Sequence, residues 1–185
     1  MTRTIVITVG SSEEGGRRLR AEVPGARFVR ADLSSPHQTR DLVERLRAEH
    51  LAIDALVLAA FRFNRVRVET EDGFEHTFAL YVINRWLMAE GLRDPLEKAE
   101  APVIVNLCGA GRGGRIRWDD LQLRNGYWTV TATMQGARAG ELLGAAYAAG
   151  HPEAAGHPET AGRPEAGGLT KYVLYNPVFV AAGPA

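Results

Sequence analysis

The sequence predicts a single α/β domain of three layers, in which helices cover both faces of a parallel sheet of about five strands. Three observations predict this fold class. Short runs of β-branched and other apolar residues recur along the chain, as in strands that are buried on both faces. Longer segments with apolar residues at helical spacing separate these runs, which is the alternation that produces a parallel sheet. The length of 185 residues suits one domain.

The first elements follow from apolar runs and their punctuation. Residues 4–9 (TIVITV) form the first β-type run, and residues 17–22 predict a short helix that ends before Pro24-Gly25. Residues 26–33 (ARFVRADL) predict the second strand. Ser35 then precedes Pro36, the usual order of an N-cap and a first helical residue.

The rest of the chain continues this alternation. Leu42, Val43, Leu46 and Leu51 give the helix after Pro36 an apolar side. The later strands are predicted at residues 55–61, 102–107 and 171–175, and the later helices at 71–97 and 131–149. A glycine- and arginine-rich stretch at 109–126 separates the fourth strand from the last helix.

One segment is not expected to join the core. Residues 149–166 repeat a six-residue unit, AGHPEA, with a proline in each copy and no large apolar residue. Such a composition predicts a disordered loop at about 149–168 within the single domain 1–185. His151 and His157 lie in the repeat, but two histidines make an incomplete metal site, and a solvated linker is the favoured interpretation.

Composition excludes several classes of function. Lys plus Arg and Asp plus Glu each number 22, so no global charge favours nucleic acid or an anionic membrane. Cys108 is the only cysteine, so no internal disulfide can form and a cytoplasmic setting is expected. No apolar run approaches the roughly 20 residues that span a bilayer, and the first residues do not have the form of a signal peptide.

Several stretches, in order, carry a resemblance to a known family. They are TIVITVGSS (4–12), ARFVRADLSS (26–35), IDALVLAA (53–60), DGFEHTFAL (72–80), PVIVNLCG (102–109), GGRIRWDDLQL (113–123) and KYVLYNPVFVAAG (171–183). Together they resemble the short-chain dehydrogenases/reductases, in particular the retinol-dehydrogenase-like branch. The resemblance implies a Rossmann-like sheet. Because Gly15 and Phe28 are too close for the family's helix–strand–helix, one unit is missing, which implies a strand order near 2-1-3-4-5.

The cofactor turn departs from the family pattern. Val9 and Glu13 stand where the family has glycines that let the backbone approach a pyrophosphate. The carboxylates of Glu13 and Glu14 would repel that dianion, although acidic residues also stabilise a helix N-terminus. Asp32, which resembles the family's adenine-side aspartate, remains. We therefore expect no bound cofactor.

The catalytic pair of the family is also absent. The family uses a tyrosine as proton donor and a lysine four residues later. Neither lysine, Lys98 or Lys171, has a tyrosine four positions before it. The resemblance aligns Thr133 with the tyrosine and Ala137 with the lysine. It also aligns Gly109 with the family's serine and Tyr81 with its helical asparagine. The expectation is a protein that is not an NAD(P)-dependent oxidoreductase and that holds no metal.

A small-molecule pocket is still expected at the carboxyl ends of the strands. Tyr81 and Thr133 are the candidate catalytic residues. The candidate substrate-binding residues are Phe61, Arg62, Cys108, Tyr127, Trp128, Met134 and Asn176. This rim favours a non-redox protein that binds an apolar molecule, such as a cofactor-independent cyclase or isomerase of a biosynthetic pathway.

Most of these residues have a structural interpretation as well. Cys108 ends a buried strand, where a thiol usually only packs. Tyr81 lies on an apolar helix stripe and suits core or dimer packing. His76, beside Glu75, suits a structural role. The acid pair Asp119-Asp120 suits a structural loop. Arg112, Arg115 and Arg117 suit either an anion site or a solvated loop.

A second hypothesis is a catalytically dead pseudoenzyme that acts as a protein-binding partner. The resemblance implies a homodimer through the helices at 71–97 and 131–149, whose faces keep large apolar residues, including Trp86, Leu87 and Leu142. A filled pocket and a stable complex would distinguish this hypothesis from the first.

Overall fold

The computed structural model describes residues 3–10, 12–108, 114–150 and 169–176. Within them, four parallel strands lie in the order β1-β2-β3-β4. The strands are β1 (Ile5–Thr8), β2 (Ala55–Leu58), β3 (Val103–Leu107) and β4 (Lys171–Tyr175). The helical elements are α1 (Glu13–Glu22), α2 (Pro36–Glu49), α3 (His76–Phe78), the π-helical turn η1 (Ala79–Ile83), α4 (Asn84–Gly91), α5 (Arg93–Glu97) and α6 (Thr129–Gly150). The predicted α/β class with a truncated Rossmann-like parallel sheet is confirmed.

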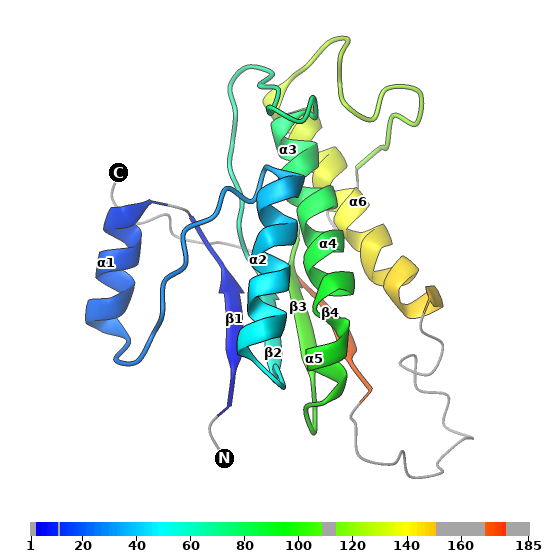
Figure 1. Cartoon of the computed structure of the whole chain (residues 1–185). Helices are drawn as coiled ribbons and strands as arrows, with labels where there is room; N and C mark the ends of the chain where they lie inside the picture. The colour runs from blue at the N-terminus through cyan, green and yellow to red at the C-terminus, as the bar shows by residue number, and fades with distance from the viewer. Residues whose placement is uncertain (1–2, 11, 109–113, 151–168, 177–185) are drawn as a thin grey trace.

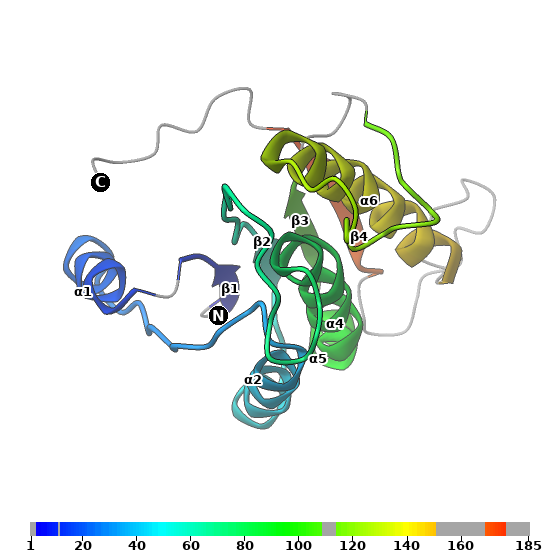
Figure 2. The same cartoon turned by 90° about the horizontal axis from the view of Figure 1, so that it is seen from above.

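The helices gather on one face of the sheet. Figures 1 and 2 show α2, α4 and α6 side by side along the strands, while α1 stands apart beyond β1. The core lies between these helices and the sheet, and its buried members are Val43, Leu46, Ile53, Leu56, Leu58, Met88, Ala89, Leu92, Leu96, Ile104 and Tyr147. Leu56 and Ile104 are fully buried because their side chains point toward α2 and α4 from the two central strands.

The helix starts follow local sequence signals. The Ser35 side chain caps α2 by accepting from the Gln38 amide, and Pro36 occupies the first turn, as predicted. Ser12 caps α1 in the same way, through the Gly15 amide at 3.1 Å. This cap makes α1 begin at Glu13, four residues earlier than the apolar pattern predicts, because two acidic residues suit a first turn.

The predicted strand at 26–33 does not join the sheet. The segment is described, but it pairs with no strand, so the sheet has four strands in the described ranges instead of five. A strand needs a neighbour within about 4.8 Å, and a cavity separates this segment from β1. Its end is held instead by polar contacts, in which the Asp32 amide donates to Gln38 Oε1 at 3.0 Å. A β-type residue pattern alone therefore did not produce a paired strand.

The other face of the sheet is open in the described part of the chain. Ile5 and Ile7 of β1 are 58% and 55% exposed, and Tyr175 of β4 is 54% exposed. Side chains alternate between faces along a strand, so these residues share the face opposite the core. The described helices thus form one full layer, while α1 lies beyond the edge strand β1 (Figure 2).

Other expectations lie beyond this description. Most of the predicted repeat loop at 149–168 falls outside the described residues. Among the helices that are described, none is both long and apolar enough to cross a bilayer. The same residues contain no cluster of three or more histidine, cysteine, aspartate or glutamate side chains suited to a metal ion.

Candidate functional site

A cavity lies at the carboxyl ends of β1 and β2, where open α/β sheets bind ligands. Its volume is about 270 Å³. It is bounded by the turn after β1, the segment that leads into α2, the residues after β2 and the start of the α3–η1 helical stretch. Its lining residues are Val9, Gly10, Ser12, Ala31, Asp32, Leu33, Ser34, Ala60, Phe61, Arg62, His76 and Leu80.

Asp32 forms part of the wall of this cavity and orders the turn before α2. Its Oδ1 accepts from the Ser34 amide at 2.9 Å and from the Ser34 hydroxyl at 2.7 Å. Ser34 is buried, whereas Asp32 is exposed. The carboxylate is therefore oriented by its own turn and presents an acceptor at the cavity edge. The Ser34-Ser35 pair after a β-type run was the sequence signal for this turn, yet the prediction gave Ser34 no role.

The turn after β1 compensates part of its negative charge. Glu13 forms an exposed ion pair with Arg30, Nη1 to Oε1 at 3.0 Å. This contact draws one carboxylate of the Glu13-Glu14 pair toward the 26–33 segment. A side-chain carbon added at Gly10 would have no neighbour within 4 Å. The backbone at this position is consequently accessible.

A cation and a histidine also line the cavity. Arg62 is exposed, and His76 is half-buried at the start of α3. Burial lowers the pKa of His76, and the charge of Arg62 lowers it further. The Asn64 amide nitrogen lies 3.1 Å from His76 Nδ1 and donates to it in the neutral ring. Phe61, 49% exposed, packs edge-on against Phe63 with centroids 5.5 Å apart.

The two candidate catalytic residues do not line this cavity. Tyr81 is buried in η1, with the Arg85 guanidinium 4.9 Å from its ring centroid. Burial raises the pKa of Tyr81 and lowers that of Arg85. The Thr133 hydroxyl donates to the Thr129 carbonyl at 2.8 Å, within α6. Both side chains thus have structural contacts, and their catalytic roles remain predictions.

The other predicted binding residues are spread over three places. Phe61 and Arg62 share the cavity. The Tyr127 hydroxyl donates to the Asn64 carbonyl at 3.0 Å, while Trp128 is exposed before α6. Met134 lines a separate, open depression beside Trp118.

The last two candidates belong to the strand ends. Cys108 is buried after β3, and its amide donates to the Tyr175 carbonyl at 3.0 Å. Asn176 is half-buried after β4. The structure therefore does not bring all seven binding candidates into one pocket.

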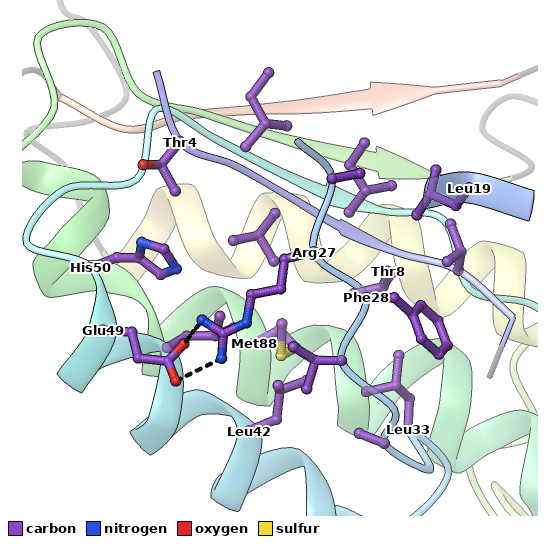
Figure 3. A pocket seen from close by; sticks show the side chains of 18 of the residues that line it. Thr4, Thr8, Leu19, Arg27, Phe28, Leu33, Leu42, Glu49, His50 and Met88 are labelled. Atoms are coloured by element: carbon purple, nitrogen blue, oxygen red, sulfur yellow. Dashed lines mark hydrogen bonds and ion pairs between the residues drawn. The ribbon is translucent and has the colours of Figure 1, made fainter. Parts of the chain in front are cut away.

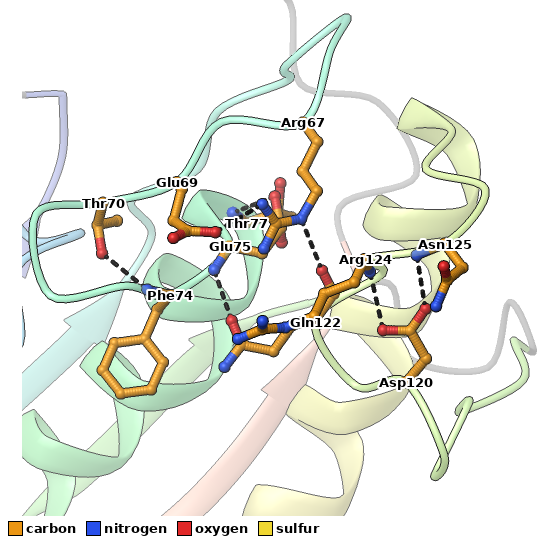
Figure 4. A network of polar contacts seen from close by, with 10 residues as sticks. All are labelled: Arg67, Glu69, Thr70, Phe74, Glu75, Thr77, Asp120, Gln122, Arg124 and Asn125. Atoms are coloured by element: carbon orange, nitrogen blue, oxygen red, sulfur yellow. Dashed lines mark hydrogen bonds and ion pairs between the residues drawn. The ribbon is translucent and has the colours of Figure 1, made fainter.

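A polar network anchors the loop before α6, as Figure 4 shows. The Glu75 amide donates to Gln122 Oε1 at 2.7 Å, and the Glu75 carboxylate caps the following helix through the Thr77 and Phe78 amides. Asp120 accepts from the Asn125 and Arg124 amides. These backbone hydrogen bonds, that from Asn125 foremost, lower its pKa. Asp120 therefore has the structural role that its motif suggested.

Sequence comparison relates the chain to dehydrogenases. It is 31% identical over 141 residues to polyprenol dehydrogenase of Danio rerio, a match that covers 70% of this chain and 44% of that protein. It is 30% identical over 112 residues to retinol dehydrogenase 13 of Mus musculus, covering 59% of this chain and 34% of that protein. The chain thus spans less than half the length of these curated relatives. No family model matches it.

Structural comparison gives the same fold. An uncharacterized protein from Mycobacterium paratuberculosis superposes with a TM-score of 0.73 at 18% identity, covering 93% of this chain and 58% of that one. A metagenomic short-chain oxidoreductase, whose crystal structure contains NADP, superposes with a TM-score of 0.61 at 14% identity. That match covers 97% of this chain and 71% of the oxidoreductase.

These relatives correct the functional expectation. The matched proteins are named as dehydrogenases, so the comparisons point to redox function and contradict a non-redox cyclase or isomerase. The prediction was wrong because it gave the lost cofactor and catalytic motifs more weight than the rest of the sequence, which matches these dehydrogenases. The strand order, the cavity at the strand ends and the matched relatives agree: the chain is a short-chain dehydrogenase/reductase-like protein.

Proposed function

We propose that this chain binds a nicotinamide adenine dinucleotide in the strand-end cavity and takes part in a dehydrogenase or reductase reaction. The observation that carries the proposal is the cavity itself. It lies at the carboxyl ends of β1 and β2 and joins an accessible glycine, Gly10, to an acceptor, Asp32, and a cation, Arg62. This is the location at which Rossmann-like sheets hold dinucleotides.

The residues present fit the two ends of an adenine nucleotide. The Asp32 carboxylate, fixed by Ser34, accepts a hydrogen bond from an exocyclic amino group. Arg62 is an exposed residue of the same lining, and a guanidinium binds phosphate oxygens in a planar, bidentate manner. Arg62 therefore supplies positive charge against the acidic residues of the turn.

The turn after β1 must tolerate the phosphates. Arg30 pairs with Glu13 at 3.0 Å and neutralises one of the two carboxylates. Glu14 stays as an acidic residue in the first turn of α1. We expect weaker binding than in a protein with a glycine-rich turn, because this carboxylate repels the dianion.

The substrate class follows from the relatives' names. Polyprenols and retinol are lipophilic alcohols, and we propose a lipophilic alcohol or its carbonyl product as the substrate here. When bound, a nicotinamide would provide the hydride chemistry at the carbon that bears the oxygen. The chain's contribution is to orient the nucleotide through Asp32 and Arg62. The Thr133 hydroxyl is occupied by Thr129, so the proton exchanged with the oxygen comes from solvent. The single buried thiol, Cys108, suits a cytoplasmic setting for this reaction.

Calorimetric titration with NADPH and NADH tests the binding. We expect saturable binding in the micromolar range. Arg62→Ala should weaken it about tenfold, because a hydrogen bond to a charged group contributes about 1.5–3 kcal/mol. Asp32→Asn should weaken it less, because the amide oxygen still accepts from Ser34 and only the hydrogen bond to the amino group is lost. Arg65→Ala is the matched control, an exposed arginine three residues along that does not line the cavity. Absence of binding at millimolar nucleotide, or an equal loss in the control, would refute the site.

A gain-of-function variant tests the redox chemistry. Reduction of all-trans-retinal by NADPH, followed by loss of NADPH absorbance, should be slow in the natural chain. Thr133→Tyr combined with Ala137→Lys places a proton donor and its lysine partner on α6. Since general acid catalysis contributes about 10²–10⁴-fold, we expect at least a hundredfold acceleration. Thr133→Phe with Ala137→Lys controls for size without the hydroxyl. If nucleotide binds to every variant and none reduces the carbonyl, the redox part of the proposal fails.

A further inference from the structure

A second cavity lies between the edge strand β1 and the unpaired segment 25–33. Its volume is about 340 Å³. Figure 3 shows Arg27 and Phe28 of the segment on one side and the β1 backbone on the other, with Leu42 and Met88 from the helical layer below. The cavity thus separates two extended stretches of backbone that lie over a common apolar floor. We call it the strand slot.

On the β1 side of the strand slot, some backbone amide and carbonyl groups have no partner among the described strands of the sheet. The Thr4 amide donates to Asp54 Oδ2 at 2.7 Å, and the Thr4 carbonyl accepts from the Asp54 amide at 2.8 Å, so Thr4 faces β2. In a parallel ladder successive residues direct their amide and carbonyl groups to opposite sides. The amides and carbonyls of Ile5 and Ile7 therefore face the slot.

The segment 25–33, on the far side of the slot, also has unpaired backbone groups. Within the described part of the chain, the backbone amides of residues 27–31 donate to no acceptor. An unpaired strand edge is a template for another strand, and here two such edges face one gap. A single strand between them would satisfy both. The edge of a second folded sheet would not enter, because the segment 25–33 closes the far side.

The charge of Arg27, one of the two arginines that line the slot, is already compensated. Arg27 is held by Glu49, Nη1 to Oε2 at 2.8 Å and Nη2 to Oε1 at 2.9 Å. This pair lies at the end of the slot where β1 begins, beside His50 (Figure 3). The remainder of the floor is apolar, with Leu42 and Leu46 of α2 and Met88 of α4. The complementary occupant is an uncharged extended segment with apolar side chains.

We propose that the strand slot binds residues 178–182 (Val-Phe-Val-Ala-Ala) of a second copy of this chain by β-strand addition. This stretch is the uncharged, β-branched and aromatic run among the residues outside the described ranges. Within one chain the beginning of this run falls short of the slot. The slot lies beyond β1, four strand spacings from β4, which is about 19 Å. Residues 178–180 follow Tyr175 by three to five positions and span at most about 10–18 Å, so a second copy is the donor that can offer the whole run.

A synthetic peptide of residues 176–185 tests this proposal on the full-length protein. The measurement is fluorescence anisotropy of the labelled peptide, with sedimentation velocity of the unlabelled protein. We expect saturable peptide binding and a concentration-dependent dimer, and we expect excess peptide to dissociate the dimer. The peptide with Phe179→Asp should not bind, because a carboxylate would enter an apolar floor.

Two variants at one position distinguish strand addition from non-specific hydrophobic binding of the peptide. Ile7→Pro removes the amide hydrogen that faces the slot but leaves the pairing with β2, as proline does at an edge strand. We expect it to weaken peptide binding about tenfold. Ile7→Ala keeps the amide and should bind within twofold of the natural chain. Equal losses in both variants would overturn strand addition. A protein that stays monomeric, or a dimer that excess peptide leaves intact, would overturn the proposed occupant.

Discussion

The two faces of the sheet differ in how completely they are covered. On one face, α2, α4 and α6 bury Leu56 and Ile104 completely. On the other, within the described residues, Ile5 and Ile7 are more than half exposed although they belong to the same parallel sheet. Parallel sheets are normally covered on both faces. The same residue types thus belong to the core on one face and to the surface on the other. An apolar β-type run therefore predicts a strand, but not whether helices cover both of its faces.

The edges of the sheet repeat this contrast. β2 and β3 each have two neighbours, whereas β1 has β2 on one side and the strand slot on the other. The residues that follow β1 hold the candidate nucleotide cavity. One edge strand of the sheet therefore borders both proposed binding sites.

The largest expected effect comes from truncating the covered face. Ile104→Ala should lower the free energy of unfolding by about 2–5 kcal/mol, because it removes a fully buried side chain and leaves a cavity. Ile5→Ala, 58% exposed on the open face, should cost less than about 1 kcal/mol. Denaturant unfolding followed by far-ultraviolet circular dichroism measures both. Equal losses would mean that the open face is covered in solution.

A smaller effect should separate two glycines with similar close contacts. A side-chain carbon at Gly91 would lie 2.6 Å from Cγ1 of Val43, and one at Gly16 would lie 2.4 Å from the Phe28 ring. Val43 is buried and stiff, so Gly91→Ala should cost about 1–3 kcal/mol. Phe28 is half-buried beside the strand slot and can swing away. The gain in helix propensity, about 0.5–1 kcal/mol, should leave Gly16→Ala nearly neutral.

The same unfolding measurement on both glycine variants checks this difference. Gly91→Ser is an additional control, because it adds the same carbon and one oxygen and should cost at least as much. If Gly16→Ala proved the more damaging substitution, then Phe28 would be held as firmly as a core residue. The strand slot would then be more rigid than its open lining indicates.

The sequence predicted the covered half of the molecule better than the uncovered half. Apolar runs located the four paired strands, and the Ser35-Pro36 pair located the cap of α2, because each of these features depends on local residue types. It misassigned the segment at 26–33, whose pairing depends on a neighbour that the pattern does not reveal. The candidate site was dispersed for a related reason. The resemblance placed Tyr81 and Thr133 at reactive positions, but the contacts with Arg85 and Thr129 are set by tertiary packing and helix geometry.

The smallest effect concerns the pH dependence of stability at the cavity wall. Burial lowers the pKa of His76 below the ordinary value of 6.5, and Arg62 lowers it further. Since the unfolded chain then binds the proton more tightly than the folded chain, stability is fully present above pH 6.5. It is lost as the pH falls from there through the folded pKa. The neutral ring also accepts from Asn64, a hydrogen bond that protonation of Nδ1 removes.

Unfolding curves between pH 7.5 and 5.5 would show this as a decline that His76→Gln abolishes. His37, an exposed histidine beside Asp41 at 3.2 Å, provides the matched control, since His37→Gln should leave the decline intact. Carboxylates add to acid destabilisation below this range, so the difference between the two variants is the informative quantity. A decline that survives His76→Gln would place its source away from the cavity. In that case water would reach the cavity wall near Arg62 more freely than the half-buried His76 indicates. The solvent exposure of the cavity would then be closer to that of the open face of the sheet than to that of the covered face.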